Sequence, residues 1–320
     1  MENAQSIYAM NTQSPITFKD SLKSWDTENW LDRVFYRPVG FKIALLLRST
    51  PITPNIITII SIFVGVAACL LFYPDNNLLI NLLGFLLLIF ANILDCVDGQ
   101  LARITGIKSK IGRILDGFCG DIWFLTFYLV ICFRLLHGNE RILSSFGVEW
   151  GWWVFLIALI SAYSHFNQAA MVDYYKTLHL HFLGGGKDSE FEDAASVKAH
   201  FQTLTWKKEP ISKAFLKLYQ IYTLNQERKT PQLQLYIKSM HNKYPDGFPA
   251  EKMVEFREKS LKMMPLLDSF TFNARSLVML ATLLLNVEWF YFAIEIIVLN
   301  PLLAFAIHKH EKMCFNLNQQ

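Results

Sequence analysis

The sequence predicts an all-α protein that crosses a membrane several times through apolar helices. Hydrophobic residues make up 52% of the 320 residues and charged residues only 18%, whereas about a quarter of an average soluble domain is charged. The chain contains 26 Phe, 8 Trp and 12 Tyr, and Trp and Tyr gather where membrane helices meet the lipid headgroups. The net charge of +3 is too small to indicate a nucleic-acid-binding protein.

Six segments are expected to span the membrane, since a helix needs roughly 20 apolar residues to cross the hydrocarbon layer. They are 55–73, 78–95, 112–135, 150–172, 265–284 and 287–307. The fifth is the weakest, because Asp268, Asn273 and Arg275 interrupt its first half. It is still expected to span, because residues 276–284 are too apolar for a loop in water.

Lysine and arginine in the connecting segments predict the orientation. They are frequent in the N-terminal segment, the loop between the second and third spans, the 173–264 connection and the C-terminal tail. The connections 73–77 and 286–289 contain none, and the third loop holds only Arg134 and Arg141. Because basic loops stay in the cytoplasm, we expect both termini and the basic loops on the cytoplasmic side.

The segment before the first span mixes apolar and basic residues between positions 15 and 48, with Trp25 and Trp30 among the apolar ones. Such a mixture is typical of an amphipathic helix lying on the inner leaflet, here with an expected break at Pro38 and Gly40. The alternative, a solvated N-terminal arm, is disfavoured because the segment contains two tryptophans and several basic residues.

The long connection after the fourth span is expected to be a cytoplasmic helical insert. It contains a flexible Gly184-Gly185-Gly186 break and then reads as helical between the prolines at 210, 231, 245 and 249. The glycines are not a phosphate-binding loop, because no Gly-Lys-Ser/Thr ending follows them. The predicted division is 1–50 (amphipathic segment), 51–172 (spans one to four), 173–264 (insert) and 265–320 (spans five and six with the tail).

Four aspartates lie close together at the junction of the second and third spans. Asp95 and Asp98 are three residues apart, so on a helix they share one side, and the small Gly99 and Ala102 leave room beside them. The loop to the next span is short, so the helix that carries Asp116 is expected to be an antiparallel neighbour. Asp121 follows soon after on the same helix. The carboxylates are therefore expected to converge at the cytoplasmic ends of these spans.

Converging carboxylates at a membrane boundary are costly unless a cation neutralises them. Oxygen ligands suit hard cations such as Mg²⁺, Mn²⁺ or Ca²⁺, and Mg²⁺ commonly shares a few carboxylates with substrate phosphates. The alternative is a set of helix-end aspartates that face water. Three or four aspartates with small residues between them favour the metal site.

The stretch Asp95-Cys-Val-Asp98-Gly99-Gln-Leu-Ala102-Arg103, followed by Gly112-Arg-Ile-Leu-Asp116, resembles the motif of the CDP-alcohol phosphotransferases, also called CDP-alcohol phosphatidyltransferases. Pro54-Asn55 with Thr58 resembles the opening motif of that family. The resemblance covers residues 50–172 well and 265–307 loosely, and it leaves out the 173–264 insert.

The resemblance implies a reaction in which an alcohol hydroxyl attacks the β-phosphate of a CDP-linked substrate and CMP leaves. Asp95, Asp98 and Asp116 would hold one or two divalent ions, Mg²⁺ or Mn²⁺. The residues implied to border the CDP group are Asn55, Thr58, Gly99, Ala102, Arg103 and Gly112. The resemblance also implies a homodimer. The donor would be CDP-diacylglycerol with a polar alcohol, or a CDP-activated head group with a lipid acceptor.

One departure concerns the general base. The family's last aspartate would fall at position 120, where this chain has Gly120, with Asp121 next to it. A one-residue shift on a regular helix moves the carboxylate by about 100° around the axis and roughly 1.5 Å along it. Three outcomes are open: a π-bulge returns Asp121 to the site as metal ligand and base, another group acts as base, or the protein is a non-catalytic binder of metal and CDP-lipid.

Polar residues inside later spans are candidates for the acceptor site. Arg275 with Asn273 could bind an anionic alcohol, or Arg275 could pair with Asp268 or with the site carboxylates. His165 could line the same pocket, although a packed, hydrogen-bonded histidine is the more common situation. For Glu295 we expect an interhelical hydrogen bond. A transporter is disfavoured, because the aspartates lie at one membrane face and transporter sites lie near the midplane.

Overall fold

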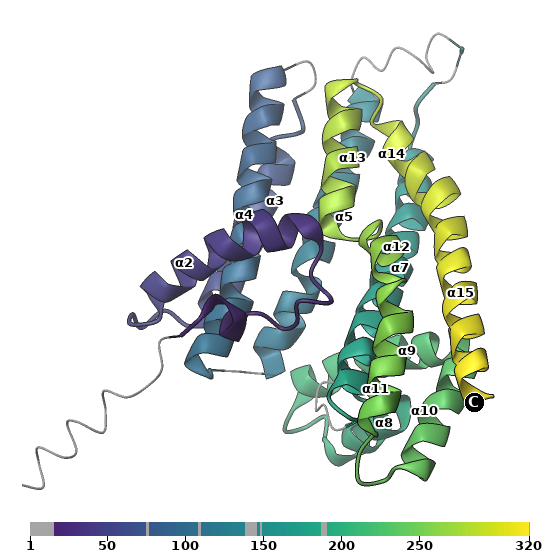
Figure 1. Cartoon of the computed structure of the whole chain (residues 1–320). Coiled ribbons are helices and arrows are strands. Elements are labelled where there is room, and N and C mark those ends of the chain that lie inside the picture. Colours follow the sequence, from purple (N-terminus) through teal and green to yellow (C-terminus); the bar gives the residue numbers. More distant parts are fainter. Residues whose placement is uncertain are drawn as a thin grey trace, which may run out of the picture. The chain divides into compact units, whose positions relative to one another are not determined.

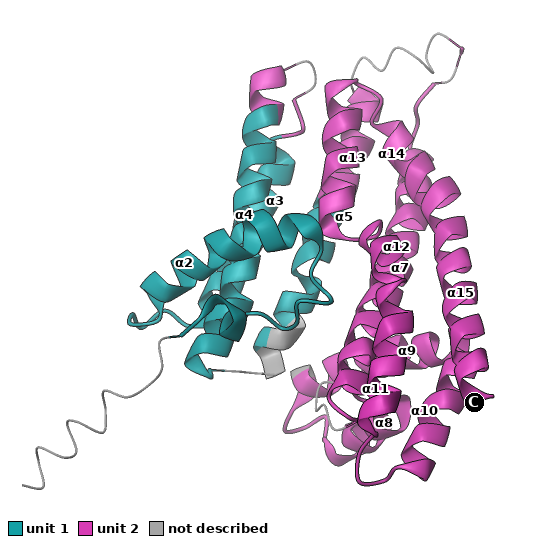
Figure 2. Cartoon of the chain, in the orientation of Figure 1, with its two compact units in different colours: residues 1–71, 82–126 teal, residues 72–81, 127–320 magenta. Residues whose placement is uncertain are grey.

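The computed structural model describes residues 16–74, 77–107, 110–137, 146–147, 149–186 and 191–319, so Arg141 lies outside it. Within these residues the regular elements are all helices, without a strand (Figure 1), and the predicted all-α class is confirmed. The chain divides into two compact units, drawn in teal and magenta in Figure 2. Unit 1 comprises residues 1–71 and 82–126, and unit 2 comprises 72–81 and 127–320. The four-part division expected from the sequence stays a prediction.

The first half of the described chain contains six helical elements. They are η1 (Phe18–Ser21), η2 (Asp32–Tyr36), α2 (Arg37–Leu47), α3 (Pro54–Leu70), α4 (Leu78–Thr105) and α5 (Lys110–His137). The remaining described residues form α7 (Val154–Leu183), α8 (Ala194–Thr203), α9 (Pro210–Lys229), α10 (Pro231–Lys243), α11 (Ala250–Leu261), α12 (Met264–Asp268), α13 (Phe272–Leu284), α14 (Trp289–Ala293), η3 (Ile294–Leu299) and α15 (Asn300–Asn318).

Four helices of the described residues are long and apolar enough to cross a membrane. They are α4, residues 115–137 of α5, α7, and the run Trp289–Asn318 formed by α14, η3 and α15. The other two predicted spans correspond to α3 and α13, whose 17 and 13 residues reach about 26 Å and 20 Å at 1.5 Å per residue. Because the hydrocarbon layer is roughly 30 Å thick, the number of six spans stays a prediction.

Two short π-helical segments precede prolines. The segment η2 ends two residues before Pro38, and η3 ends two residues before Pro301. Proline lacks an N–H and its ring crowds the carbonyl four residues earlier, so a widened turn before it relieves the clash without ending the helix. The predicted break at Pro38 and Gly40 is therefore wrong, since the chain remains helical from η2 through α2.

Two glycines let the helices of unit 1 approach closely. A Cβ on Gly40 of α2 would lie 2.5 Å from the Gln100 side chain of α4, and a Cβ on Gly65 of α3 would overlap the indole of Trp123 on α5. Beside the second contact, the Cys69 thiol donates to the Trp123 carbonyl at 3.3 Å. These contacts hold α2 against the aspartate-bearing α4 and α3 against α5.

In unit 2, α7 and the run from α14 to α15 each contain 30 residues, about 45 Å of helix, which exceeds the bilayer core. The second half of α7, parts of α15 and the insert helices α10 and α11 share one hydrophobic core. Its members include Leu178 and Phe182 of α7, Tyr236 of α10, Phe256 of α11 and Cys314 of α15. The insert is thus packed on two long helices and is not a separate domain.

The described residues of the insert form the helices α8 to α11, and its cytoplasmic location stays a prediction. Pro210 and Pro231 occupy the first positions of α9 and α10, where a missing N–H costs nothing. The prediction that Gly184–Gly186 is a flexible break is wrong. The Gly186 N–H donates to the His181 carbonyl at 2.9 Å, the Gly185 carbonyl accepts from the Phe248 N–H at 2.9 Å, and both Gly185 and Gly186 have positive φ. The triplet is an ordered helix end.

The fifth predicted span is broken. The one-turn helix α12 ends at Asp268, and α13 begins only at Phe272, so its helix is shorter than the predicted 265–284. Arg134, assigned to the third loop from the sequence, lies in α5. It is buried, pairs with Glu288 at 2.5 Å and donates to the Phe72 carbonyl at 2.7 Å.

Candidate metal centre and active site

Three of the predicted aspartates meet in unit 1. Asp95 and Asp98 lie one turn apart on α4 and Asp116 lies on α5, and each offers a carboxylate oxygen within 4.8 Å of the other two. Asp98 is buried, Asp95 is half-buried and Asp116 is exposed. The cluster therefore runs from the helix interface outward, so a ligand could reach it from the Asp116 side.

The aspartate oxygens have the character of metal ligands. Among the described residues, Asp95 Oδ1 and Asp98 Oδ2 are shielded from solvent and accept no hydrogen bond. Buried polar atoms without a partner are rare in folded proteins, and a lone buried carboxylate is costly. A hard divalent cation bound by these oxygens would remove that cost, so the residues fit the predicted Mg²⁺ or Mn²⁺ site.

Two residues outside the aspartate set lie beside the carboxylates. Thr58 on α3 neighbours Asp98, and Cys119 on α5 neighbours Asp95. The Thr58 hydroxyl itself donates to the Pro54 carbonyl at 3.1 Å. Cys119 in turn lies 3.3 Å from the Ser61 hydroxyl. From the sequence, Thr58 is expected beside the nucleotide. Cys119 is not singled out there, and its only signal is its position three residues after Asp116 on the same helix face.

Asp121 is not part of the group formed by Asp95, Asp98 and Asp116. The helix α5 is regular α-helix over residues 110–137, so the π-bulge suggested for this stretch is not there. On such a helix Asp121 lies about 140° around the axis from Asp116 and roughly 7.5 Å along it. A catalytic or metal-binding role for Asp121 stays a prediction.

The residues predicted to border CDP all lie in unit 1. Asn55 and Thr58 are on the first turns of α3, Gly99, Ala102 and Arg103 are on the last turns of α4, and Gly112 is near the start of α5. On α4 these positions follow Asp95 and Asp98 along the helix, and on α5 Gly112 lies one turn before Asp116. Their contact with a nucleotide stays a prediction.

Arg103 and Gln100 tie α4 to the N-terminal segment. Arg103 Nε donates to the Ser21 carbonyl at 2.5 Å, and its guanidinium lies beside Gly99. Gln100 donates to the Ser21 hydroxyl at 2.9 Å and to the Arg37 carbonyl at 3.1 Å. Gln100 was not singled out from the sequence, although a glutamine in an otherwise apolar helix is itself a signal for a specific hydrogen bond.

The residues predicted to bind the acceptor lie in unit 2, where they form a buried polar network. Arg275 of α13 pairs with Glu295 of η3, donates to Gln168 Oε1 at 2.6 Å and to the Phe270 carbonyl at 2.9 Å, and lies 2.9 Å from His165 Nδ1. The expected partners of Arg275 were Asp268 and the site carboxylates. Asp268 pairs instead with Lys176 at 3.3 Å.

The same network confirms the expectations for Glu295 and for His165 as packed side chains. The Tyr128 hydroxyl donates to Glu295 Oε2 at 2.9 Å and lies 3.0 Å from His165 Nδ1, so three helices meet there. Asn273 is buried as well. Acceptor binding by Arg275, Asn273 and His165 stays a prediction.

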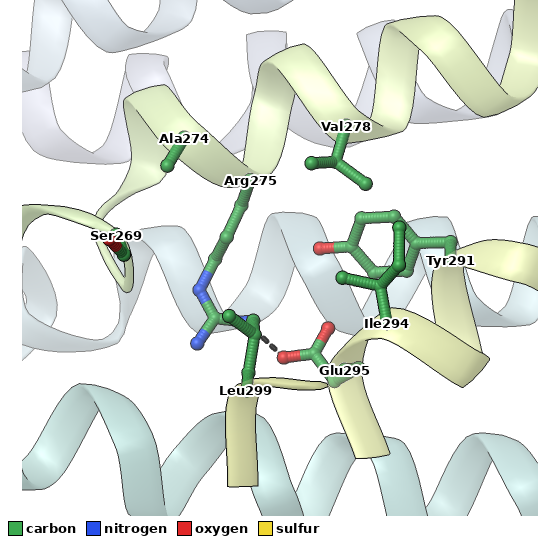
Figure 3. Close-up of a pocket in the computed structure, with 8 residues that line it drawn as sticks. All are labelled: Ser269, Ala274, Arg275, Val278, Tyr291, Ile294, Glu295 and Leu299. Atoms are coloured by element: carbon green, nitrogen blue, oxygen red, sulfur yellow. Dashed lines mark hydrogen bonds and ion pairs between the residues drawn. The ribbon is translucent and has the colours of Figure 1, made fainter. Parts of the chain in front are cut away.

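A small pocket opens beside this network. Figure 3 shows Arg275 pointing from α13 toward Glu295, with the Tyr291 hydroxyl on the other side of the pocket. The pocket is small, with about 40 Å³ open to the centres of water molecules, which is room for a few waters. The Arg275 guanidinium is occupied by Glu295, Gln168 and the Phe270 carbonyl in this structure.

Comparisons with known proteins agree with the aspartate site. Residues 51–204 match the family model described as CDP-alcohol phosphatidyltransferase, which includes the whole stretch from Asn55 to Asp121. The match extends past residue 172 into α8, and residues 265–307 lie outside it.

Several curated relatives are named as phosphatidylinositol phosphate or archaetidylinositol phosphate synthases. Phosphatidylinositol phosphate synthases of Mycobacterium bovis and Mycobacterium tuberculosis are each 27% identical over 110 residues, 31% of this chain and 49% of theirs. The archaetidylinositol phosphate synthase of Pyrococcus horikoshii is 43% identical over 75 residues, 23% of this chain and 38% of its own. The chain thus spans about half the length of the mycobacterial relatives and 38% of the archaeal one. With its aspartate motif, its helical fold and this match, residues 51–204 belong to the CDP-alcohol phosphatidyltransferase family, a family of transferases.

Proposed function

We propose that the protein is a divalent-metal-dependent membrane transferase. It moves a phosphatidyl group from CDP-diacylglycerol to the hydroxyl of a polar alcohol and releases CMP, as a step of phospholipid synthesis. The observation that carries the proposal is the convergence of Asp95, Asp98 and Asp116 with two carboxylate oxygens that accept no hydrogen bond from the described residues. Membership in the transferase family supports the same chemistry.

The proposed reaction exchanges one phosphorus–oxygen bond for another. The acceptor oxygen forms a bond to the β-phosphorus, and the bond from that phosphorus to the oxygen bridging the two phosphates breaks. The bridging oxygen leaves with CMP, and the acceptor's proton passes to a base. The lipid product is a phosphodiester, and no oxidant or further reactant is required.

The aspartates would hold one or two Mg²⁺ or Mn²⁺ ions. When bound, such ions neutralise phosphate charge and orient the reacting groups. The chain's own contribution is to place the carboxylates: Thr58 lies beside Asp98, Cys119 lies beside Asp95, and the close approach at Gly65 keeps α3 against α5. Exposed Asp116 is the ligand at which substrate phosphates would enter.

We propose Asp121 as the base that takes the acceptor's proton. It is half-buried and lies on the same helix as Asp116, and a carboxylate in an apolar helix usually has a function. The second candidate is a non-catalytic binder of metal and CDP-lipid, which is favoured by Gly120 at the position of the family's last aspartate. The two candidates differ in a single outcome, the release of CMP.

For the acceptor we propose a phosphorylated inositol, because both kinds of relative are named as phosphatidylinositol or archaetidylinositol phosphate synthases. The buried Arg275 already pairs with Glu295, so an acceptor phosphate at Arg275 would have to displace that carboxylate. Other alcohols, and a CDP-activated head group with a lipid acceptor, are the alternatives to compare. We also propose six spans, an active site on the cytoplasmic side and a homodimer.

The test is CMP release by the purified protein with CDP-diacylglycerol and a panel of alcohols, with Mg²⁺, Mn²⁺ or a chelator. Asp98→Asn and Asp121→Asn are the informative variants. Asp26→Asn, in the N-terminal part of unit 1 and outside the aspartate group, is the matched control. Metal-dependent release that both variants lose and the control keeps is the expected result.

Loss in Asp98→Asn alone would retain the transferase and exclude Asp121 as the base. Metal and CDP-lipid binding without CMP release, for every alcohol and for CDP-activated head groups, would establish the binder instead.

A further inference from the structure

The insert helix α9 is packed with its polar side inward and its apolar side outward. The buried residues of its second half are Gln220, Thr223 and Gln226, whereas Leu218 and Ile221 are 57% and 55% exposed. A helix on the surface of a water-soluble domain shows the opposite pattern. The outward face of α9 therefore needs an apolar surrounding that the described chain does not supply.

The contacts of α9 place this helix at the depth of the inner membrane boundary. Its last turns bind α7: Gln226 donates to the Ala170 carbonyl at 2.8 Å, Asn225 donates to Asn167 at 2.9 Å, and the Tyr222 hydroxyl donates to Asp173 at 3.3 Å. These α7 residues lie 13 to 19 positions after Val154, about 20–28 Å along the helix.

The other end of α7 marks the opposite boundary. Trp152 and Trp153 directly precede the helix and are 74% and 45% exposed, as expected of a tryptophan belt at the lipid headgroups. A hydrocarbon layer of roughly 30 Å that begins there ends near Asp173. The residues of α7 that contact α9 lie within about 10 Å of that second boundary.

Positive charge surrounds the apolar face. Residues 206–229 contain six basic residues and two acidic ones, and Lys207, Lys208, Lys217 and Arg228 are all exposed. Trp206, 56% exposed, lies in the same loop as the first two lysines. Lysines with long aliphatic stems beside exposed leucine and isoleucine are typical of helices that lie in the headgroup layer of anionic membranes.

We propose that α9 with the 204–209 loop is a membrane-docking surface, which binds the anionic headgroups of the same bilayer that α7 crosses. Leu218, Ile221 and Leu224 enter the boundary of the acyl chains, and the basic residues pair with lipid phosphates. The inference depends on α7 crossing the membrane and not on the transfer reaction, so either can fail without the other.

The test uses the full-length protein in vesicles, labelled with a small environment-sensitive fluorophore on an introduced cysteine. All five native cysteines are buried, so labelling is directed to the new thiol, and the native chain serves as the blank. The probe position is Ile221→Cys. The matched control is Val254→Cys, which is 54% exposed on α11.

The control position lies far from the proposed boundary. The neighbours of Val254 pack at the end of α7, where the rings of Phe182 and Phe256 are 4.0 Å apart, and Phe182 is about 42 Å along α7 from Val154. Vesicles contain phosphatidylcholine with about 30% phosphatidylglycerol and a lipid that carries a nitroxide on its acyl chain.

We expect the nitroxide to quench the label at position 221 at least about twofold more than the label at 254. Replacing Lys207, Lys208 and Lys217 together by Glu, or omitting phosphatidylglycerol, should reduce the quenching at 221. Equal quenching at both positions would overturn the proposal. So would an apolar environment at 221 without quenching, since a protein surface such as a second copy would then cover α9. Quenching at 221 that stays the same after both the Lys-to-Glu substitutions and the omission of phosphatidylglycerol would overturn the role of anionic lipid.

Discussion

The buried ion pair between Arg275 and Glu295 should be essential for the stability of unit 2. Both side chains are at most 2% exposed, and Glu295 also accepts a hydrogen bond from Tyr128 at 2.9 Å. Replacing Glu295 by Gln keeps the shape but leaves the guanidinium without a counter-charge. Breaking a buried pair from one side costs about 3–5 kcal/mol, which corresponds to a melting temperature lower by roughly 6–12 °C.

The assay is thermal unfolding of the purified protein in detergent, followed by tryptophan fluorescence. Glu255→Gln is the matched control, because Glu255 pairs with Lys252 and Lys259 at 2.9 and 2.7 Å on the surface of α11. An exposed pair contributes only about 0–1 kcal/mol. The double variant Arg275→Met with Glu295→Leu should regain most of the loss, since an apolar replacement of both partners leaves no buried charge.

Glu295→Gln that melts within about 2 °C of the Glu255→Gln control would refute the reasoning. It would mean that water or lipid headgroups reach the guanidinium, or that α13 and η3 do not pack as described. A double variant less stable than Glu295→Gln would refute the charge argument specifically.

Three further predictions concern packing, capping and metal binding. Gly65→Ala should destabilise unit 1 by about 1–3 kcal/mol, because its Cβ would overlap the Trp123 indole. The control Gly117→Ala, with no described atom within 4 Å of the new Cβ, should be neutral or stabilise α5 by about 0.5–1 kcal/mol. Equal melting temperatures of the two variants would contradict the close contact at Gly65. Glu311→Gln should lower the free energy of unfolding by about 1 kcal/mol in the same melting assay. The Glu311 carboxylate accepts hydrogen bonds from the N–H groups of Gln232 at 2.7 Å and Leu233 at 3.2 Å at the start of α10. An unchanged melting temperature would show that water replaces this cap. Saturating Mn²⁺ should raise the melting temperature of the native protein but not of Asp98→Asn, since a ligand that binds only the folded state stabilises it. An equal rise in both proteins would mean that Mn²⁺ binds outside the aspartate group.

The aspartate site could be predicted because its information is local. Asp95 and Asp98 are one helical turn apart, and Asp116 follows across a short loop, so spacing and periodicity bring them together. Thr58 and Cys119 complete the site from helices whose rotation about their axes the sequence does not reveal. Asp121 shows the limit, since only the structure excludes a π-bulge in α5.

The fold was less predictable where distant residues decide it. Arg275 and Asp268 are close in sequence, but the partner of Arg275 is Glu295, which the π-helical segment before Pro301 presents. The glycines at 184–186 looked like a break, and only the contact between Gly186 and Phe248 makes them an ordered helix end. The insert was expected to be helical from its prolines, but nothing local predicts that its core would be shared with α15.

The central claim is that Asp95, Asp98 and Asp116 bind a divalent cation that the reaction requires. Its most direct test is a Mn²⁺ titration followed by electron paramagnetic resonance, with the native protein, Asp98→Asn, Asp116→Asn and the control Asp26→Asn. We expect saturable binding of one or two Mn²⁺ by the native protein and the control, and at least about tenfold weaker binding by the two site variants. Equal binding by all four proteins, or no saturable binding to the native protein with CDP-diacylglycerol present, would contradict it.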